Sequence, residues 1–173
     1  MEPYDFASLL LRLALGGVML AHGIKHARGK EKTSRWFGSI GFKYSTIQWF
    51  ASTATEIGVG FLLIVGFLTT AAVAGVIGIM TVAFFSVHRS VGFWITARPD
   101  EGWEYVMLIA VAGTALAMFG PGQVSIDDAI NVGSTTLALG LDGWVGLAGA
   151  GLGLAAGLLQ LATFFRPGDV ESA

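Results

Sequence analysis

Cysteine is absent from this chain of 173 residues, and charged side chains are scarce. Without a thiol, the chain itself forms no disulfide, thiolate metal site or iron–sulfur cluster and carries out no thiol redox chemistry. Charged residues make up 13% of the sequence, against about 25% in soluble domains. Together with a mean hydropathy of +0.69, this shortage indicates a surface that faces lipid. The sequence also lacks a Gly-rich phosphate loop and any nucleic-acid-binding motif.

The region from Trp49 to Val87 contains one ionisable side chain, Glu56. A single helix of that length would be roughly 58 Å long at the usual rise per residue, whereas the hydrocarbon core of a bilayer is about 30 Å thick. The region therefore predicts a hairpin of two membrane-spanning helices that turns near residues 66–70. Glu56 then lies inside a membrane helix, where a carboxylate is costly and usually functional.

Five apolar segments are candidates for membrane helices. With approximate ends, they lie at Phe6–Gly23, Ile47–Leu68, Thr70–Val87, Trp103–Phe119 and Gly143–Phe165. The first segment has the alternative of a secretory signal peptide. It begins with acidic rather than basic residues and ends in a basic loop, so we expect it to remain as a membrane helix.

The positive charges predict an orientation. Nine of the ten Lys and Arg residues fall on one side of the membrane if the helices alternate: Lys25, Arg28, Lys30, Lys32, Arg35, Lys43, Arg89, Arg98 and Arg166. Because Lys and Arg favour the cytoplasmic side, we expect the N-terminus outside and the C-terminus in the cytoplasm.

The loop at residues 120–142 is expected on the outside, and it carries a helix-start pattern. Ser125 precedes Asp128 by three residues, close to a capping box, after a Pro-Gly turn. We expect a short amphipathic helix from Ile126 to Leu139 along the membrane surface, with an ordinary loop as the alternative.

Polar residues at the predicted cytoplasmic ends of the helices form the first candidate site. They are Glu56, His22, His88, Glu104 and Tyr105. Carboxylate, imidazole and phenol groups are those that a quinone site or a proton relay uses. The alternative is that the histidines and Glu104 lie at the interface as helix caps while Glu56 pairs with a neighbour for packing. No residue pattern points to a metal site.

Arg12 is the charged residue near the outer end of the first segment. Its side chain can extend to the interface without a partner, or bind an anionic lipid headgroup, a substrate anion or Asp127. We favour a structural ion pair between Arg12 and Asp127.

The last segment carries small residues at a spacing of four. Gly149, Gly153 and Gly157 share a helix face that Gln160 continues, and such a face lets another helix approach closely. The spacing alone leaves open whether the partner lies within the bundle or in another chain. We expect a helix of another chain, because four preceding helices leave the last one fewer internal surfaces to fill.

An ordered series of short motifs resembles the DoxX family of small bacterial membrane proteins over about residues 6 to 130. The series consists of Arg12, His22-Gly23-x-Lys25, Gly38-x-x-Gly41-Phe42, Glu56-x-x-x-Gly60, Gly66-Phe67-Leu68-Thr69, His88 and Gly120-Pro121-Gly122-x-x-Ser125-x-Asp127. The resemblance implies a four-helix membrane bundle located in a bacterial inner membrane. It also implies membership of a group named from a subunit of a thiosulfate:quinone oxidoreductase. The chain departs from the four-helix length by its fifth helix.

We therefore expect an all-α integral membrane bundle, with a DoxX-like core and outer loop helix at residues 1–142. Residues 143–173 would supply a fifth membrane helix and a short cytoplasmic tail. The expected function is a small membrane subunit of a quinone-linked redox or cell-envelope enzyme complex, with quinone as the expected cofactor. The alternatives are a non-catalytic assembly subunit that docks a larger membrane protein through the fifth helix, and a small proton-coupled transporter that uses Glu56. No flavin, haem or iron–sulfur motif supplies an electron source in the chain.

Overall fold

The computed structural model describes residues 2–98, 101–132 and 142–167, and this part of the chain is helical with no β-strand. Four helices are long and apolar enough to cross a membrane: α1 (Pro3–Arg28), α3 (Ser45–Val65), α4 (Thr69–Ser86) and α8 (Asp142–Phe164). Helix α5 (Glu104–Phe119) is apolar but shorter, at 16 residues. The prediction of an all-α membrane bundle is confirmed.

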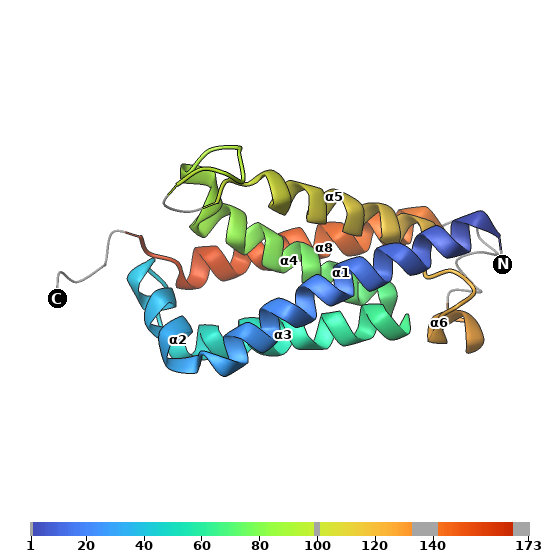
Figure 1. The fold of residues 1–173 in the computed structure, drawn as a ribbon, viewed down its shortest axis with the longest axis horizontal. Coiled ribbons are helices and arrows are strands. Elements are labelled where there is room, and N and C mark those ends of the chain that lie inside the picture. Colours follow the sequence, from blue (N-terminus) through green and yellow to red (C-terminus); the bar gives the residue numbers. More distant parts are fainter. Residues whose placement is uncertain (1, 99–100, 133–141, 168–173) are drawn as a thin grey trace.

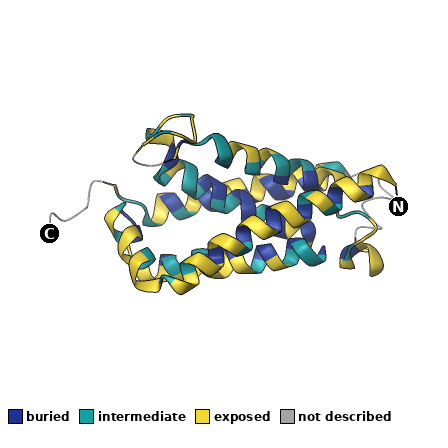
Figure 2. Cartoon of the chain, viewed as in Figure 1, coloured by how far each residue is buried: buried dark blue, intermediate teal, exposed yellow. Residues whose placement is uncertain are grey.

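The helices form two groups that lie side by side (Figure 1). Helix α1 packs against α3, while α4, α5 and α8 pack against one another. Helix α2 (Lys30–Ser39), the 3₁₀ turn η1 (His88–Ser90) and the end of α8 lie at one end of the bundle, which we call the α2 end. The N-terminus, the α3–α4 turn and the short helix α6 (Ile126–Ala129) lie at the opposite end, the α6 end. Figure 2 shows that buried positions gather where the helices face one another.

The predicted hairpin is confirmed, with its turn between Val65 and Thr69. Gly66 has φ 66° and ends α3 in the left-handed conformation that glycine adopts without strain. The carboxylate of Asp127 then accepts hydrogen bonds from the backbone N–H groups of Leu68 and Thr69, each at 2.8 Å. A residue remote in sequence therefore satisfies the first N–H groups of α4.

Helices α1 and α3 approach closely because glycines face the interface. A Cβ atom on Gly16 would lie 2.8 Å from the carbonyl oxygen of Gly60, and one on Gly60 would lie 2.8 Å from the backbone nitrogen of Leu20. Larger residues at either position would push the helices apart. This close approach fixes how far α1 and α3 stand from each other near the polar residues described below.

The outer helix is shorter than the predicted Ile126–Leu139. Its predicted start is right, since Ser125 Oγ accepts a hydrogen bond from the Asp128 N–H at 3.1 Å. Helix α6 then ends at Ala129, and Asn131 adopts φ 56°, a left-handed conformation that a helix does not continue. Residues 133–139 of the predicted helix lie outside the described residues.

The glycine face of α8 packs inside its own bundle, so the prediction that it contacts another chain is wrong. A Cβ atom on Gly149 would lie 2.6 Å from Thr70 Cγ2, one on Gly153 2.1 Å from the carbonyl oxygen of Ala74, and one on Gly157 2.8 Å from that of Gly78. All three neighbours belong to α4. Gln160 continues the face, and its Nε2 donates a hydrogen bond to Gln48 Oε1 of α3 at 2.8 Å. The small residues serve close packing of α8 on α4.

Candidate functional site

A cavity of about 890 Å³ opens near the α2 end of the bundle, between the α1–α3 pair and the group of α4, α5 and α8. Its apolar walls include Met19, Ile79, Val82, Ile109 and Leu152. Its polar lining contains His22, Lys25, His26, Lys32, Ser52, Glu56, His88, Glu101, Tyr105 and Gln160. The polar groups come from both sides of the cavity, so a ligand there would meet α1 and α3 on one side and η1 and α5 on the other.

Glu56 is the central polar group on the α1–α3 side. Its side chain is buried, with 4% of the residue exposed. Glu56 Oε2 lies 2.9 Å from His26 Nδ1, and Ser52, one turn earlier on α3, donates a hydrogen bond to Glu56 Oε1 at 3.2 Å. Gly23 brings α1 against this part of α3, because a Cβ atom there would lie 3.1 Å from the Cβ of Glu56. Glu56 thus lies inside the bundle, away from lipid, where a carboxylate would be most costly.

His26 is the partner of Glu56 that the sequence interpretation missed. Helix α1 continues past the expected end at Gly23 to Arg28, and the Trp49 indole N–H fixes this extension by donating to the His26 carbonyl at 2.9 Å. The available signal was the spacing of four between His22 and His26, which places both on one helix face. His22 itself is exposed and lines the cavity, with its ring centroid 6.4 Å from that of His26.

His88 and Tyr105 form the polar group on the opposite side. His88 Nδ1 lies 2.6 Å from the carbonyl oxygen of Glu101, and Tyr105 Oη lies 2.7 Å from His88 Nε2. Because a carbonyl oxygen only accepts, a neutral His88 carries its proton on Nδ1 and accepts from the Tyr105 hydroxyl at Nε2. A buried imidazole, 7% exposed, therefore holds a phenol in a fixed position at the cavity wall.

Four of the five residues in the predicted polar site line this cavity, and Glu104 does not. Its carboxylate Oε2 accepts a hydrogen bond from the Ile95 N–H at 3.1 Å and so braces the loop between η1 and α5. This role resembles the alternative given in the sequence analysis, in which Glu104 lies at the membrane interface. Among the described residues, no cluster of three or more His, Asp or Glu side chains has the geometry of a metal site.

At the α6 end, the predicted ion pair between Arg12 and Asp127 is replaced by two separate sets of contacts. Arg12 is completely buried. Its guanidinium donates to the carbonyl oxygens of Leu63, Ile64 and Val124, which places a positive charge at the negative end of the α3 dipole. Asp127 binds the start of α4 instead. No direct ion pair joins Arg12 and Asp127 in the described part of the chain.

Two further polar residues of α1 hold the same outer loop, and the sequence interpretation missed them. Asp5 Oδ1 accepts from the Gln123 N–H at 2.9 Å, and Ser8 Oγ donates to the Gly120 carbonyl at 3.0 Å. With Arg12 they follow a spacing of three and four, which was the available signal for one polar face. Because this end of the bundle is closed by backbone contacts, the cavity near the α2 end is the better candidate for a ligand site.

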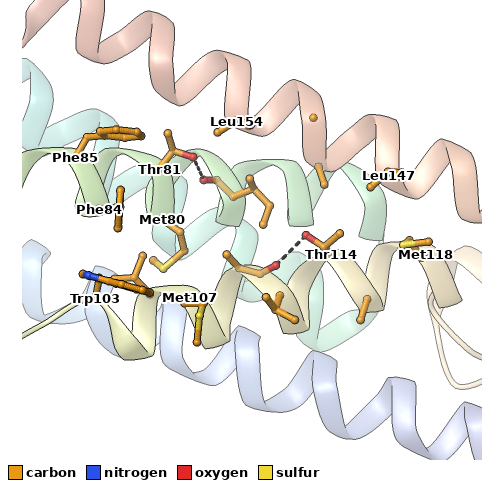
Figure 3. A pocket seen from close by; sticks show the side chains of 17 residues that line it. Met80, Thr81, Phe84, Phe85, Trp103, Met107, Thr114, Met118, Leu147 and Leu154 are labelled. Carbon is orange, nitrogen blue, oxygen red and sulfur yellow. Dashed lines mark hydrogen bonds between the residues drawn. The ribbon is translucent and has the colours of Figure 1, made fainter. Parts of the chain in front are cut away.

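A second, apolar depression lies between α4, α5 and α8, and Figure 3 shows it with its lining side chains. Its volume is about 820 Å³. The lining side chains are mainly hydrophobic and include Met80, Phe84, Trp103, Met107, Met118 and Leu154. We call it the apolar groove, and the site around Glu56 and Tyr105 the polar cavity.

The DoxX family model matches residues 7–89. This match supports membership of the DoxX family. The matched region contains Arg12, His22, Glu56 and His88, whereas Tyr105 and Asp127 lie beyond it. The DoxX resemblance seen in the sequence is thereby confirmed.

A curated protein of Haemophilus influenzae is also similar to this chain. The two are 25% identical over 130 residues, which are 70% of this chain and 82% of that protein. It is described as an uncharacterized protein, so it suggests no activity. No solved structure matches the chain.

Proposed function

We propose that this protein binds the headgroup of a quinone in the polar cavity and serves as a small membrane subunit of a redox or cell-envelope enzyme complex. The observation that carries the proposal is the pair of polar groups on opposite sides of one cavity. Glu56 with His26 lies on one side, and Tyr105 with His88 lies on the other. A flat ring with two carbonyl oxygens needs hydrogen-bonding groups at its two ends.

The two sides differ in the chemistry they offer. Tyr105 carries a hydroxyl that can turn from His88 toward a ligand carbonyl, and His88 is held in place by the Glu101 carbonyl. Glu56 and His26 form a pair that can take up or release a proton near the opposite carbonyl. Reduction of a quinone consumes protons as well as electrons, so a proton-exchanging pair beside the ring suits that reaction.

The electrons would come from a partner subunit. The chain holds no flavin, haem or iron–sulfur motif. We therefore favour the role of a membrane subunit over that of a complete enzyme. The inner membrane, with the N-terminus outside and the α2 end in the cytoplasm, is the proposed location. The basic residues Lys25 and Lys32 at the cavity support this orientation.

Binding of a soluble short-tail quinone to the purified protein tests the proposal. Tyr105→Phe removes one hydroxyl from the cavity, and we expect it to weaken binding by about fivefold to tenfold, the usual effect of one lost hydrogen bond. Tyr44→Phe is the matched control, because Tyr44 is 68% exposed and does not line the cavity. Equal binding by both variants and the unaltered protein would contradict the proposal. Ion flux by this chain alone in liposomes would favour the transporter instead.

A further inference from the structure

The apolar groove runs along the bundle from the end at which the polar cavity lies. Trp103 and Phe84 line it near the start of α5, and Met118 and Leu147 line it near the other end of that helix (Figure 3). From Val106 to Met118 the groove follows α5 for about 18 Å at the rise of an α-helix. It is therefore a long depression rather than a round pocket.

The groove offers hydrocarbon contact and few hydrogen bonds. Its two threonine hydroxyls, on Thr81 and Thr114, donate to the carbonyl oxygens of Ile77 and Ala110 in their own helices, each at 2.8 Å (Figure 3). Several of the other lining residues, including Met80, Met107 and Met118, have flexible thioether side chains that adapt to irregular apolar shapes. The lining thus suits a branched hydrocarbon chain.

Met80 connects the groove to the polar cavity, since among the described residues it alone lines both. Neighbouring positions of α5 face the two spaces in turn. Tyr105 and Ile109 line the polar cavity, while Val106 and Ala110 line the groove. The two spaces are therefore separated by one layer of side chains, and Met80, 6% exposed, is the flexible member of that layer.

We propose that the groove binds the isoprenoid tail of the quinone whose headgroup lies in the polar cavity, with the tail passing Met80. This inference rests on the proposed function and adds a second binding region to it. The occupant is a single hydrocarbon chain, because the lining is almost wholly apolar and reaches the polar cavity at Met80, where the headgroup of the same molecule would lie.

Two photoreactive quinones test the proposal on the whole protein in nanodiscs. Both carry one benzoquinone headgroup and a long isoprenoid tail. The first has a diazirine on the headgroup, and the second has it at mid-tail. Peptide mass spectrometry then identifies the labelled residues. We expect the headgroup probe to label the surroundings of His88 and Tyr105, and the tail probe to label α5 from Val106 to Met118 and the groove residues of α8. An excess of unlabelled long-tail quinone should remove both signals.

The two proposals fail in different ways. Tail labelling spread over the exposed faces of α1 and α3, with headgroup labelling still in the polar cavity, would overturn the tail site alone. Absence of headgroup labelling in the polar cavity would overturn the proposed function. Tail labelling in the groove without headgroup labelling would mean that the groove binds ordinary hydrocarbon chains, and it would overturn the two-part site as well.

A variant pair makes the test specific. Gly151 lines the groove, and a Cβ atom on it would meet no other atom within 4 Å, so Gly151→Leu fills the groove without a clash at its Cβ. Gly58→Leu is the matched control, since Gly58 also has open space and lines neither the groove nor the polar cavity. We expect Gly151→Leu to reduce tail labelling by on the order of tenfold, the size of effect that overfilling a packed site has. Binding of the short-tail quinone should stay unchanged, and equal tail labelling in both variants would overturn the proposal.

Discussion

His26 of α1 and Glu56 of α3 pair across the interface between their helices, with Nδ1 and Oε2 2.9 Å apart. Neither of these two atoms has another hydrogen-bond partner in the described structure. Each atom therefore has only the other as a polar partner, and a ligand that approaches either one would change both. This dependence makes the pair the most sensitive part of the polar cavity.

Glu56→Gln tests that pair. The change keeps the side-chain shape and removes the charge, so we expect binding of a short-tail quinone to weaken by about tenfold. The free energy of unfolding should fall by no more than about 1–2 kcal/mol, because the amide still offers a polar partner to His26, whose side chain is 19% exposed. Glu31→Gln is the control, since Glu31 is 87% exposed and pairs with Arg35 at the surface. A large loss of stability with unchanged binding would assign Glu56 to packing alone.

Arg12→Met tests the contacts at the α6 end. The variant keeps much of the apolar stem but removes the guanidinium from the carbonyl oxygens of Leu63, Ile64 and Val124. Among these, Leu63 still accepts from the Gly66 N–H. We expect the free energy of unfolding in detergent to fall by about 2–4 kcal/mol, since hydrogen bonds to a charged group are the strong ones. Arg35→Met, at an exposed position, should have little effect. If both variants unfold alike, the buried guanidinium does not stabilise the bundle.

Asp127→Ala tests the cap that the outer loop places on α4. Loss of the carboxylate leaves the N–H groups of Leu68 and Thr69 without their acceptor. We expect a loss of about 1–2 kcal/mol in the free energy of unfolding, as for other helix caps. Faster amide hydrogen exchange at Leu68 and Thr69 should accompany it. Asp128→Ala, at an exposed neighbouring position, is the control, and equal exchange in the two variants would argue against the cap.

The fold was largely predictable because the membrane limits it strongly. A run as long as Trp49–Val87 with one ionisable side chain has few alternatives to a helical hairpin. The burial of Glu56 follows from the same cost of charge in lipid. By contrast, His26 lies in a basic segment whose composition is typical of a loop. Only the packing of α1 on α3 brings His26 to Glu56.

The residues of a helix face do not identify which helix packs against it. Gly149, Gly153 and Gly157 indicate that a helix approaches closely, but any helix surface of suitable shape meets that need. In the structure, the helix that packs on this face is α4. Similarly, Asp127 is too far from α4 in sequence for its cap to be visible, because local patterns report only neighbours within a few residues.

The orientation remains a prediction that reporter fusions can test. We expect fusions after Gly66 and Gly122 to lie outside the cell and a fusion after Ala173 to lie in the cytoplasm, because nine of the ten Lys and Arg residues fall on the predicted cytoplasmic side. Helix α5 matters most here, since its 16 residues are short for a membrane span. A C-terminal reporter active outside the cell would mean that one of the five segments does not cross.

Gly153→Ala and Gly151→Ala, two residues apart on α8, test whether the glycine face stabilises the bundle from within. A Cβ atom on Gly153 would come 2.1 Å from the Ala74 carbonyl oxygen, whereas one on Gly151 would have open space. We expect Gly153→Ala to lower the free energy of unfolding by about 1–3 kcal/mol through overpacking. Gly151→Ala should leave it unchanged or raise it by up to about 1 kcal/mol, because alanine favours a helix more than glycine does. Thermal unfolding in mild detergent measures both. Equal stability of the two variants, with a change only in association with other proteins, would restore the interpretation of this face as a docking surface.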